Sequence, residues 1–106
     1  MAVSASGAVF WDHVAPLLAS GDVEEGTMMG ERCIRVHGAF LAKPHHEDGG
    51  LVVKLPKDRV AALIQRGAGQ PFVPHGRALK EWVHVPDYDA KFWNGLLAEG
   101  REFVTR

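Results

Sequence analysis

The densest group of side chains able to do chemistry is the run His45-His46-Glu47-Asp48. Imidazole nitrogens and carboxylate oxygens bind zinc and related metal ions, so the run is a candidate metal site. Zinc sites usually need a third protein ligand and a fixed geometry, which two adjacent loop histidines do not supply. We therefore interpret the run as a solvated polar loop and predict no metal ligands. A metal-binding protein or enzyme that uses the His45-His46 loop stays open as an alternative.

Cys33 is the only cysteine of the chain, so neither an intrachain disulfide nor a cysteine-based zinc site can form within it. A catalytic cysteine needs a lowered pKa and a base close by. Arg32 and Arg35 are near in sequence, but strand alternation directs Arg32 to the opposite face, and no signature places a histidine beside the thiol. We interpret Cys33 as a half-buried structural residue and predict no catalytic residues.

Two further patterns are similar to functional motifs, but the residues around them do not support those functions. Gly67-Ala68-Gly69 is similar to part of a phosphate-binding loop, but it follows a helical segment and lacks Gly-Lys-Ser/Thr. The carboxylates Asp22, Glu24 and Glu25 lack the partner pattern of general acid–base chemistry. The glycines therefore indicate a helix end and a turn, and the acidic residues indicate a solvated connector. The sequence predicts no cofactor.

Length and composition predict one ordinary globular domain. The chain has 106 residues, of which 46% are apolar and 24% charged. Its net charge of -1 argues against non-specific nucleic-acid binding, which usually leaves a strongly basic footprint. No stretch approaches the roughly 20 apolar residues that span a bilayer, and the first residues lack a signal-peptide pattern. We expect a cytoplasmic domain over 1–106 with an ordered core over about 9–104.

The elements that must position these residues follow from hydrophobic periodicity. A helix is predicted over 9–20, with a kink or break near residue 15 because Pro16 removes a helical hydrogen bond. An acidic connector over 23–26 leads into an antiparallel meander. Its three strands are predicted over 31–36, 39–43 and 51–55, and the His37-Gly38 turn needs the positive φ that glycine supplies.

The second half of the chain predicts a helix over 57–66 that ends at Gly67. Short strands over 70–73 and 79–85 follow, and Asp87 or Asp89 caps the last helix. The order α-β-β-β-α-β-β-α belongs to the α+β class. It predicts a two-layer sandwich whose antiparallel sheet carries helices on one face and leaves the other face open to a partner.

The strand over 79–85 indicates where a partner would bind. Alternation places Trp82 on the open face, opposite Leu79, Val83 and Val85, where an aromatic residue among polar neighbours suits an interface. Methionines adapt to cores and to binding surfaces alike. The candidate interface residues are Trp82, Lys80, His84, Met28 and Met29. The glycines predicted to be structurally required are Gly30, Gly38 and Gly67.

Four segments resemble a known family. They are Gly26-Thr27-Met28-Met29-Gly30, the strand–turn–strand around Gly38, Leu51-Val52-Val53-Lys54-Leu55, and Arg77-Ala78-Leu79-Lys80-Glu81-Trp82-Val83. Over roughly residues 9–104 the chain resembles the TfoX N-terminal domain family, to which the MmcQ/YjbR-like domains are related. That resemblance implies a two-layer, secretion-chaperone-like fold that often forms dimers, and a setting in bacterial competence regulation.

The function we expect is that of a small non-enzymatic bacterial regulatory or adaptor domain, which acts through protein–protein contacts and possible homodimers. The alternative is a nucleic-acid-associated transcriptional or competence regulator, which requires several basic residues to converge on the sheet. Those residues are Arg32, Arg35, Lys43, Lys54, Arg77 and Lys80.

Overall fold

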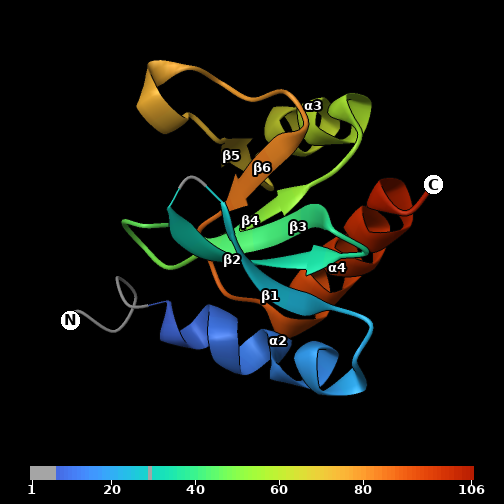
Figure 1. Cartoon of the computed structure of the whole chain (residues 1–106). Coiled ribbons are helices and arrows are strands. Elements are labelled where there is room, and N and C mark those ends of the chain that lie inside the picture. The colour runs from blue at the N-terminus through green and yellow to red at the C-terminus, as the bar shows by residue number, and fades with distance from the viewer. Residues whose placement is uncertain (1–6, 29) are drawn as a thin grey trace.

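The computed structural model describes residues 7–28 and 30–106. Within them, the helices are α2 (Ala8–Ser20), α3 (Lys57–Gln65) and α4 (Ala90–Val104), with a 3-10 turn η1 (Pro74–Gly76). The strands are β1 (Glu24–Met28), β2 (Glu31–Val36), β3 (Ala39–Pro44), β4 (Leu51–Lys54), β5 (Gln70–Pro71) and β6 (Trp82–Val85). They form one antiparallel sheet in the order β1-β2-β3-β4-β6-β5 (Figure 1). The predicted α+β class is confirmed.

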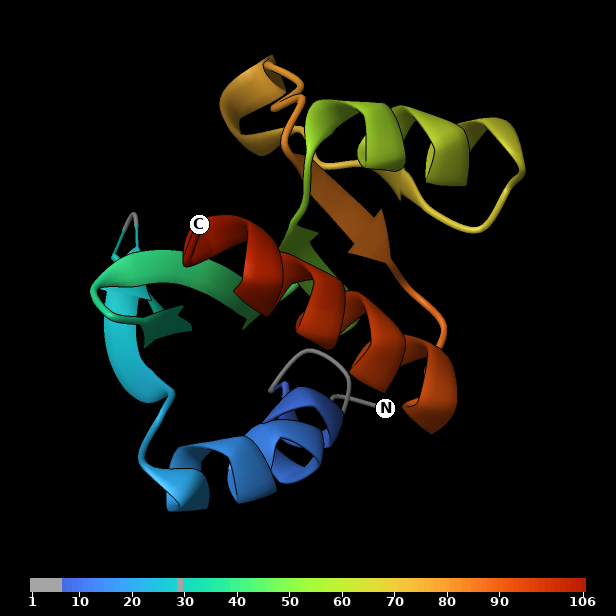
Figure 2. The ribbon, with the colours of Figure 1, turned by 90° about the vertical axis from the view of Figure 1, so that its right-hand side faces the viewer.

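All three of the described helices lie on one side of the sheet. Figure 2 looks at that side, with α3, α4 and α2 one below another in front of the strands. Their buried apolar side chains form a single core with the sheet, as the two-layer sandwich requires. This core includes Phe10, Val14, Val60, Leu63, Trp93, Leu96 and Leu97 from the helices and Ile34, Val36, Leu41, Val53, Val83 and Val85 from the strands.

The acidic connector predicted over 23–26 is wrong, because Glu24 begins the edge strand β1. Glu24 pairs with Arg35 and Thr27 pairs with Arg32, so oppositely charged and polar side chains face each other along the β1–β2 ladder. Charged residues are common on edge strands, where they discourage pairing with other chains. They also lower apparent strand propensity, which explains the error.

Pro16 does not break the first helix, which runs without interruption from Ala8 to Ser20. Phe10 and Val14 are fully buried against the sheet, and this packing offsets the one hydrogen bond that Pro16 removes. The helix ends at Gly21, whose φ of 85° lets its N–H reach the carbonyl oxygen of Leu18 at 3.3 Å.

Several predicted helix ends are confirmed, whereas two predicted strands are shorter than expected. Asp89 caps α4 by accepting a hydrogen bond from the backbone N–H of Phe92 at 3.0 Å, and Gly67 has a φ of 77° after α3. The strands predicted over 70–73 and 79–85 shrink to β5 and β6. Between them the chain makes η1 and a turn, in which the N–H of Trp82 donates to the carbonyl oxygen of Leu79 at 3.2 Å.

The predicted His37-Gly38 turn is confirmed. Both residues have positive φ, 51° and 82°, and Val36 pairs with Ala39 directly across the turn. Two consecutive positive φ values define a type I′ turn, whose twist matches that of the flanking strands. Gly30, between Met28 and its partner Glu31, also has a positive φ of 79°.

We expect Gly38→Val to lower the free energy of unfolding by about 1 kcal/mol, because a β-branched residue is strained at positive φ. Urea denaturation followed by circular dichroism measures the change. His37→Asn is the matched control and should cost little, since asparagine tolerates the left-handed region. An unchanged urea midpoint for Gly38→Val would show that the turn can take another conformation.

None of the helices in the described ranges has the length and apolarity needed to cross a membrane.

Candidate functional site

The side of the sheet away from the helices carries a second, smaller core. The pairing register aligns Lys43, Val52 and His84 across β3, β4 and β6, so their side chains share this face. Val52 packs there in a buried apolar cluster with Met28, Cys33, Phe72 and Trp82. The face that the sequence predicted to be open is therefore largely covered.

The exposed position predicted for Trp82 is wrong, although its face is right. Val83 and Val85 lie in the helix-side core, and Trp82 lies opposite them but is only 6% exposed. Phe72 and Leu79 cover it, because the N–H of Leu79 bonds the carbonyl oxygen of Phe72 at 3.0 Å and folds the connection back over the sheet. Leu79 thus contacts the Trp82 cluster, not the opposite face.

The other candidate interface residues differ in their exposure to solvent. Met28 and His84 are buried, whereas Lys80 is exposed. Met29 lies outside the described residues. Strand alternation gives the direction of a side chain but not what covers it, so the sequence could not anticipate these burials.

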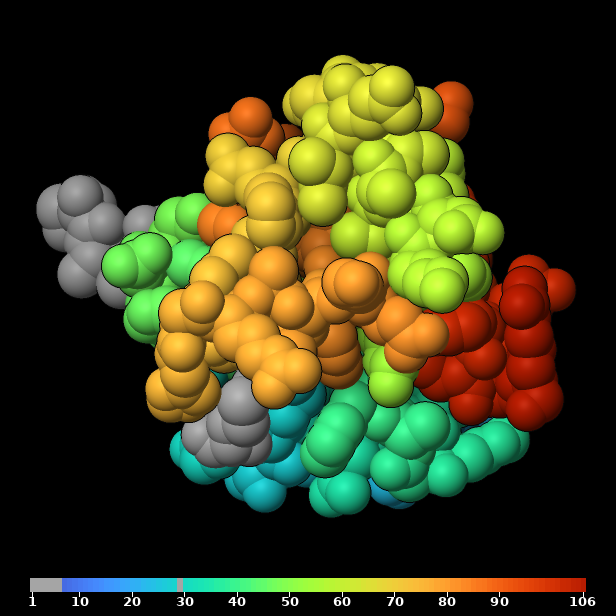
Figure 3. Space-filling view, turned by 90° about the horizontal axis from the view of Figure 1, so that it is seen from above, coloured from blue at the N-terminus to red at the C-terminus, as the bar shows by residue number. Residues whose placement is uncertain are grey.

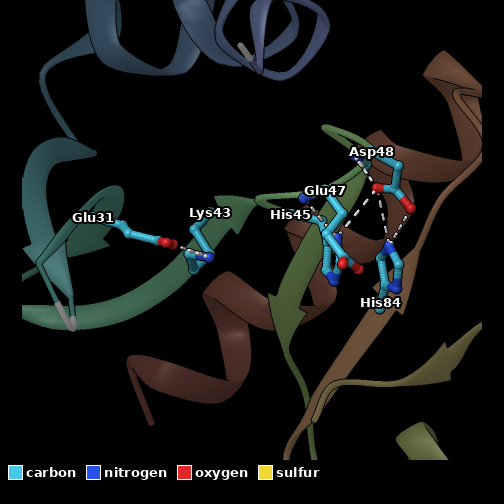
Figure 4. Close-up of polar contacts among 7 residues, drawn as sticks. Glu31, Lys43, His45, Glu47, Asp48 and His84 are labelled. Atoms are coloured by element: carbon cyan, nitrogen blue, oxygen red, sulfur yellow. Dashed lines mark hydrogen bonds and ion pairs between the residues drawn. The ribbon is translucent and has the colours of Figure 1, made fainter. Parts of the chain in front are cut away.

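Lys43 and His84 are the buried polar side chains of this face, and both have carboxylate partners. Lys43 as a whole residue is 2% exposed, and its ammonium group is paired with Oε1 of Glu31. The hydrogen bond from Lys43 lowers the pKa of Glu31 below its usual value, although partial burial opposes this. Figure 4 shows this pair on the same sheet as a second polar group around Asp48.

The second group brings His45, Asp48 and His84 together. Nε2 of His84 lies 2.9 Å from Oδ2 of Asp48, and Nδ1 of His45 lies 3.6 Å from Oδ1 of the same carboxylate (Figure 4). The two imidazole rings stack, with centroids 3.8 Å apart and planes 9° apart. One ligand atom from each of the three residues lies within 4.8 Å of the others.

The loop over 45–50 holds its side chains through its own backbone. The N–H of His45 donates to the carbonyl oxygen of Gly50, and the N–H of Gly49 donates to the carbonyl oxygen of His45, each at 2.8 Å. The N–H of Gly50 donates to Oδ1 of Asp48 at 2.8 Å. A Cβ on Gly50 would lie 2.6 Å from the carbonyl oxygen of Val85, so only glycine allows the loop to approach β6 this closely.

The interpretation of this run as a solvated loop is therefore correct only in part. His46 and Glu47 are exposed, but His45 and Asp48 are partly buried and turn toward β6. The third member, His84, was expected on an exposed strand face and is buried. No local sequence signal identifies it, because 36 residues separate it from Asp48.

Burial and neighbouring charge set the protonation of the loop residues. Partial burial lowers the pKa of His45 below its ordinary value, and the nearby His84 adds to this effect. Burial raises the pKa of Asp48, but the N–H of Gly50 and the hydrogen bond with His84 outweigh it, so the net pKa is lowered. Near neutral pH the site thus offers a neutral His45 imidazole beside an ionised carboxylate.

Cys33 is fully buried, and burial raises the pKa of its thiol. A raised pKa leaves little thiolate at neutral pH, and the thiolate is the reactive form. We expect Cys33 to react with a thiol reagent such as DTNB much more slowly than free cysteine does, and to react at the free rate in urea. Rapid alkylation of the folded protein would contradict this structural role.

Two of the six basic residues named for nucleic-acid binding, Arg32 and Lys43, are paired with carboxylates of the domain itself. The Arg32 guanidinium lies 4.0 Å from the Trp11 ring centroid and pairs with Glu25, while Lys43 is buried with Glu31. Two of the six are thus committed to contacts within the domain, which weakens the electrostatic footprint that such binding needs.

An apolar groove of about 360 Å³ lies beside Trp82, between α3 and the segment over 78–82. Figure 3 shows these parts next to each other at one end of the molecule, α3 in yellow-green and the segment in orange. Its apolar lining is formed by Val60, Ala61, Ile64, Pro71, Ala78, Leu79 and Trp82. Lys57, Asp58 and Lys80 complete its border.

Comparison of the chain with protein-family models, with curated proteins and with solved structures gives no match. The functional interpretation therefore depends on the chemistry of the groove and of the polar groups.

Proposed function

We propose that this chain is a cytoplasmic, non-enzymatic regulatory or adaptor domain that binds a partner protein in the groove beside Trp82. The observation that carries the proposal is the apolar lining of this groove, which is open to solvent and includes an aromatic residue. Apolar pockets that hold one anchoring side chain account for much of the binding energy at protein interfaces. We also infer a place among TfoX N-terminal-like domains, with which the α+β sandwich is consistent.

The charges around the groove indicate what kind of partner fits. Lys57 and Lys80 border it together with one carboxylate, Asp58. The adjoining hollow is bordered by Arg77 and Glu81. None of these three cations takes part in an ion pair within the described ranges. The groove therefore suits an extended segment with one apolar side chain flanked by acidic residues, because complementary charge speeds and orients association.

A pair of arginine substitutions on α3 tests this proposal. Ala61 is exposed and lines the groove, whereas the adjacent Ala62 is exposed and does not line it. Ala61→Arg should fill the groove without disturbing the core, and Ala62→Arg adds the same charge and length outside it. Both variants should keep the urea midpoint of the wild type.

The measurement is selection of peptides from a displayed random library, followed by affinities for the selected peptides. We expect enrichment of an apolar residue flanked by Asp or Glu, with binding at least about tenfold weaker to Ala61→Arg and unchanged for Ala62→Arg. Failure to enrich such peptides, or equal loss in both variants, would contradict the proposal. Concentration-dependent sedimentation that Ala61→Arg abolishes would identify a second copy of this chain as the occupant.

A further inference from the structure

We propose that His45, Asp48 and His84 form a binding site for a divalent transition-metal ion of the zinc type. Two imidazole nitrogens and one carboxylate are ligands that zinc and its neighbours accept, and three protein ligands leave one coordination position free. This inference is independent of the groove beside Trp82, because Ala61 and the groove share no residue with the three ligands.

The separations between the ligand atoms suit one ion. Ligands held at about 2.1 Å in a tetrahedral arrangement lie roughly 3.4 Å from one another. Nε2 of His84 and Nδ1 of His45 lie 2.9 Å and 3.6 Å from the carboxylate oxygens of Asp48, on either side of that value. The ligand atoms of all three residues lie within 4.8 Å of one another, so bringing them around one ion requires movement of the His45 ring as well as of the carboxylate.

Each histidine has one nitrogen that can become a ligand. The N–H of Glu47 donates to Nδ1 of His45 at 3.2 Å, so Nδ1 carries the lone pair, and a metal ion bound there replaces this hydrogen bond. Nε2 of His84 lies within hydrogen-bond distance of Asp48, and the tautomer with its proton on Nδ1 presents the Nε2 lone pair to a metal ion.

The ring stack predicts which side chain moves. The rings of His45 and His84 are nearly parallel, so the lone pairs of their nitrogens lie in parallel planes and cannot both point at one ion. His84 is fixed on β6 within the sheet, whereas His45 belongs to the loop. We expect the His45 ring to rotate away from the stack when the metal binds.

His45 also borders a hollow of about 250 Å³, whose lining includes Lys43 and Phe72. Water can fill the coordination position that the three protein ligands leave free.

Zinc titration of the full chain, in competition with a chromophoric chelator, tests the site. Asp48→Asn and His84→Gln should each weaken binding of one ion per chain by more than about tenfold, which is the smallest loss typical even of residues that only support a ligand. His46→Gln is the matched control, because His46 is adjacent in sequence and stacks on His45 but contributes no ligand. Its affinity should stay within about threefold of the wild type.

His84 is buried, so His84→Gln is used only if its circular dichroism matches the wild type, and the partly exposed Asp48 gives a second variant that does not depend on it. Proton and nitrogen NMR of the imidazoles provides an independent readout. Zinc should shift the ring resonances of His45 and His84 and leave those of His75 unchanged. Lack of saturable binding, or an equal loss in His46→Gln and Asp48→Asn, would overturn the proposal.

Discussion

Replacing Glu31 with alanine should lower the free energy of unfolding by about 3 kcal/mol, the lower end of the range for breaking a buried ion pair. The cause is Lys43, a residue only 2% exposed, whose ammonium group loses its carboxylate partner in this variant. Glu31 itself is about half exposed, so solvent screens part of the interaction and the upper end of the range does not apply. Urea denaturation measures the loss.

Lys43→Met is the matched partner of this variant. Removing the lysine leaves only a solvent-accessible carboxylate, so Lys43→Met alone should cost less than Glu31→Ala. The double variant should recover most of the stability that Glu31→Ala loses, and the four proteins together form a double-mutant cycle. Equal costs for the two single variants, or no recovery in the double variant, would show that Lys43 finds another partner when Glu31 is absent.

The same pair predicts a dependence on pH. The folded pKa of Glu31 lies below its ordinary value of 4.5, so the folded protein holds the Glu31 proton less tightly than the unfolded chain does. The stabilisation is therefore fully present above pH 4.5 and is lost as the pH falls through the lower, folded value. The difference in unfolding free energy between wild type and Glu31→Gln should shrink over that acidic range. A difference that stays constant would rule out the pair as its source.

Local patterns made part of the fold predictable. The hairpin at His37-Gly38, the helix end at Gly67 and the cap at Asp89 depend on a few neighbouring residues, whose conformational preferences the sequence displays directly. Alternation also assigned Trp82 to the correct face relative to Val83 and Val85. These predictions needed no knowledge of distant parts of the chain.

The features that the sequence did not predict depend on contacts between distant segments. Phe72 and Leu79 cover Trp82 because the segment between them folds back over the sheet. Strand alternation does not predict this fold of the segment. His84 reaches Asp48 only because β6 inserts next to β4 in the sheet order. The nucleic-acid alternative counted Lys43 among its basic residues, yet the neighbouring segments bury it.

The close packing of α4 on the sheet depends on one glycine. A Cβ on Gly100 would lie 2.7 Å from the backbone carbonyl oxygen of Lys54, 3.0 Å from Leu41 and 3.1 Å from Val53. The contacted residues belong to β3 and β4 and are Leu41, Val53 and Lys54. The opposite face of these two strands carries Lys43 and the polar group around Asp48. A backbone carbonyl cannot move aside as the end of a flexible side chain can, so the helix itself would have to shift.

Gly100→Ala should therefore lower the free energy of unfolding by about 2 kcal/mol, within the usual cost of overpacking a core. Gly95 is the matched control, since it lies in the same helix, is exposed and has open space where its Cβ would be. Gly95→Ala should raise the free energy of unfolding by about 0.5–1 kcal/mol, because alanine loses less backbone entropy in a helix. The same chemical change should thus have opposite signs at two positions five residues apart on α4, and urea denaturation of both variants measures it. If Gly100→Ala proved as stabilising as Gly95→Ala, α4 would have to lie farther from β3 and β4 than the structure places it.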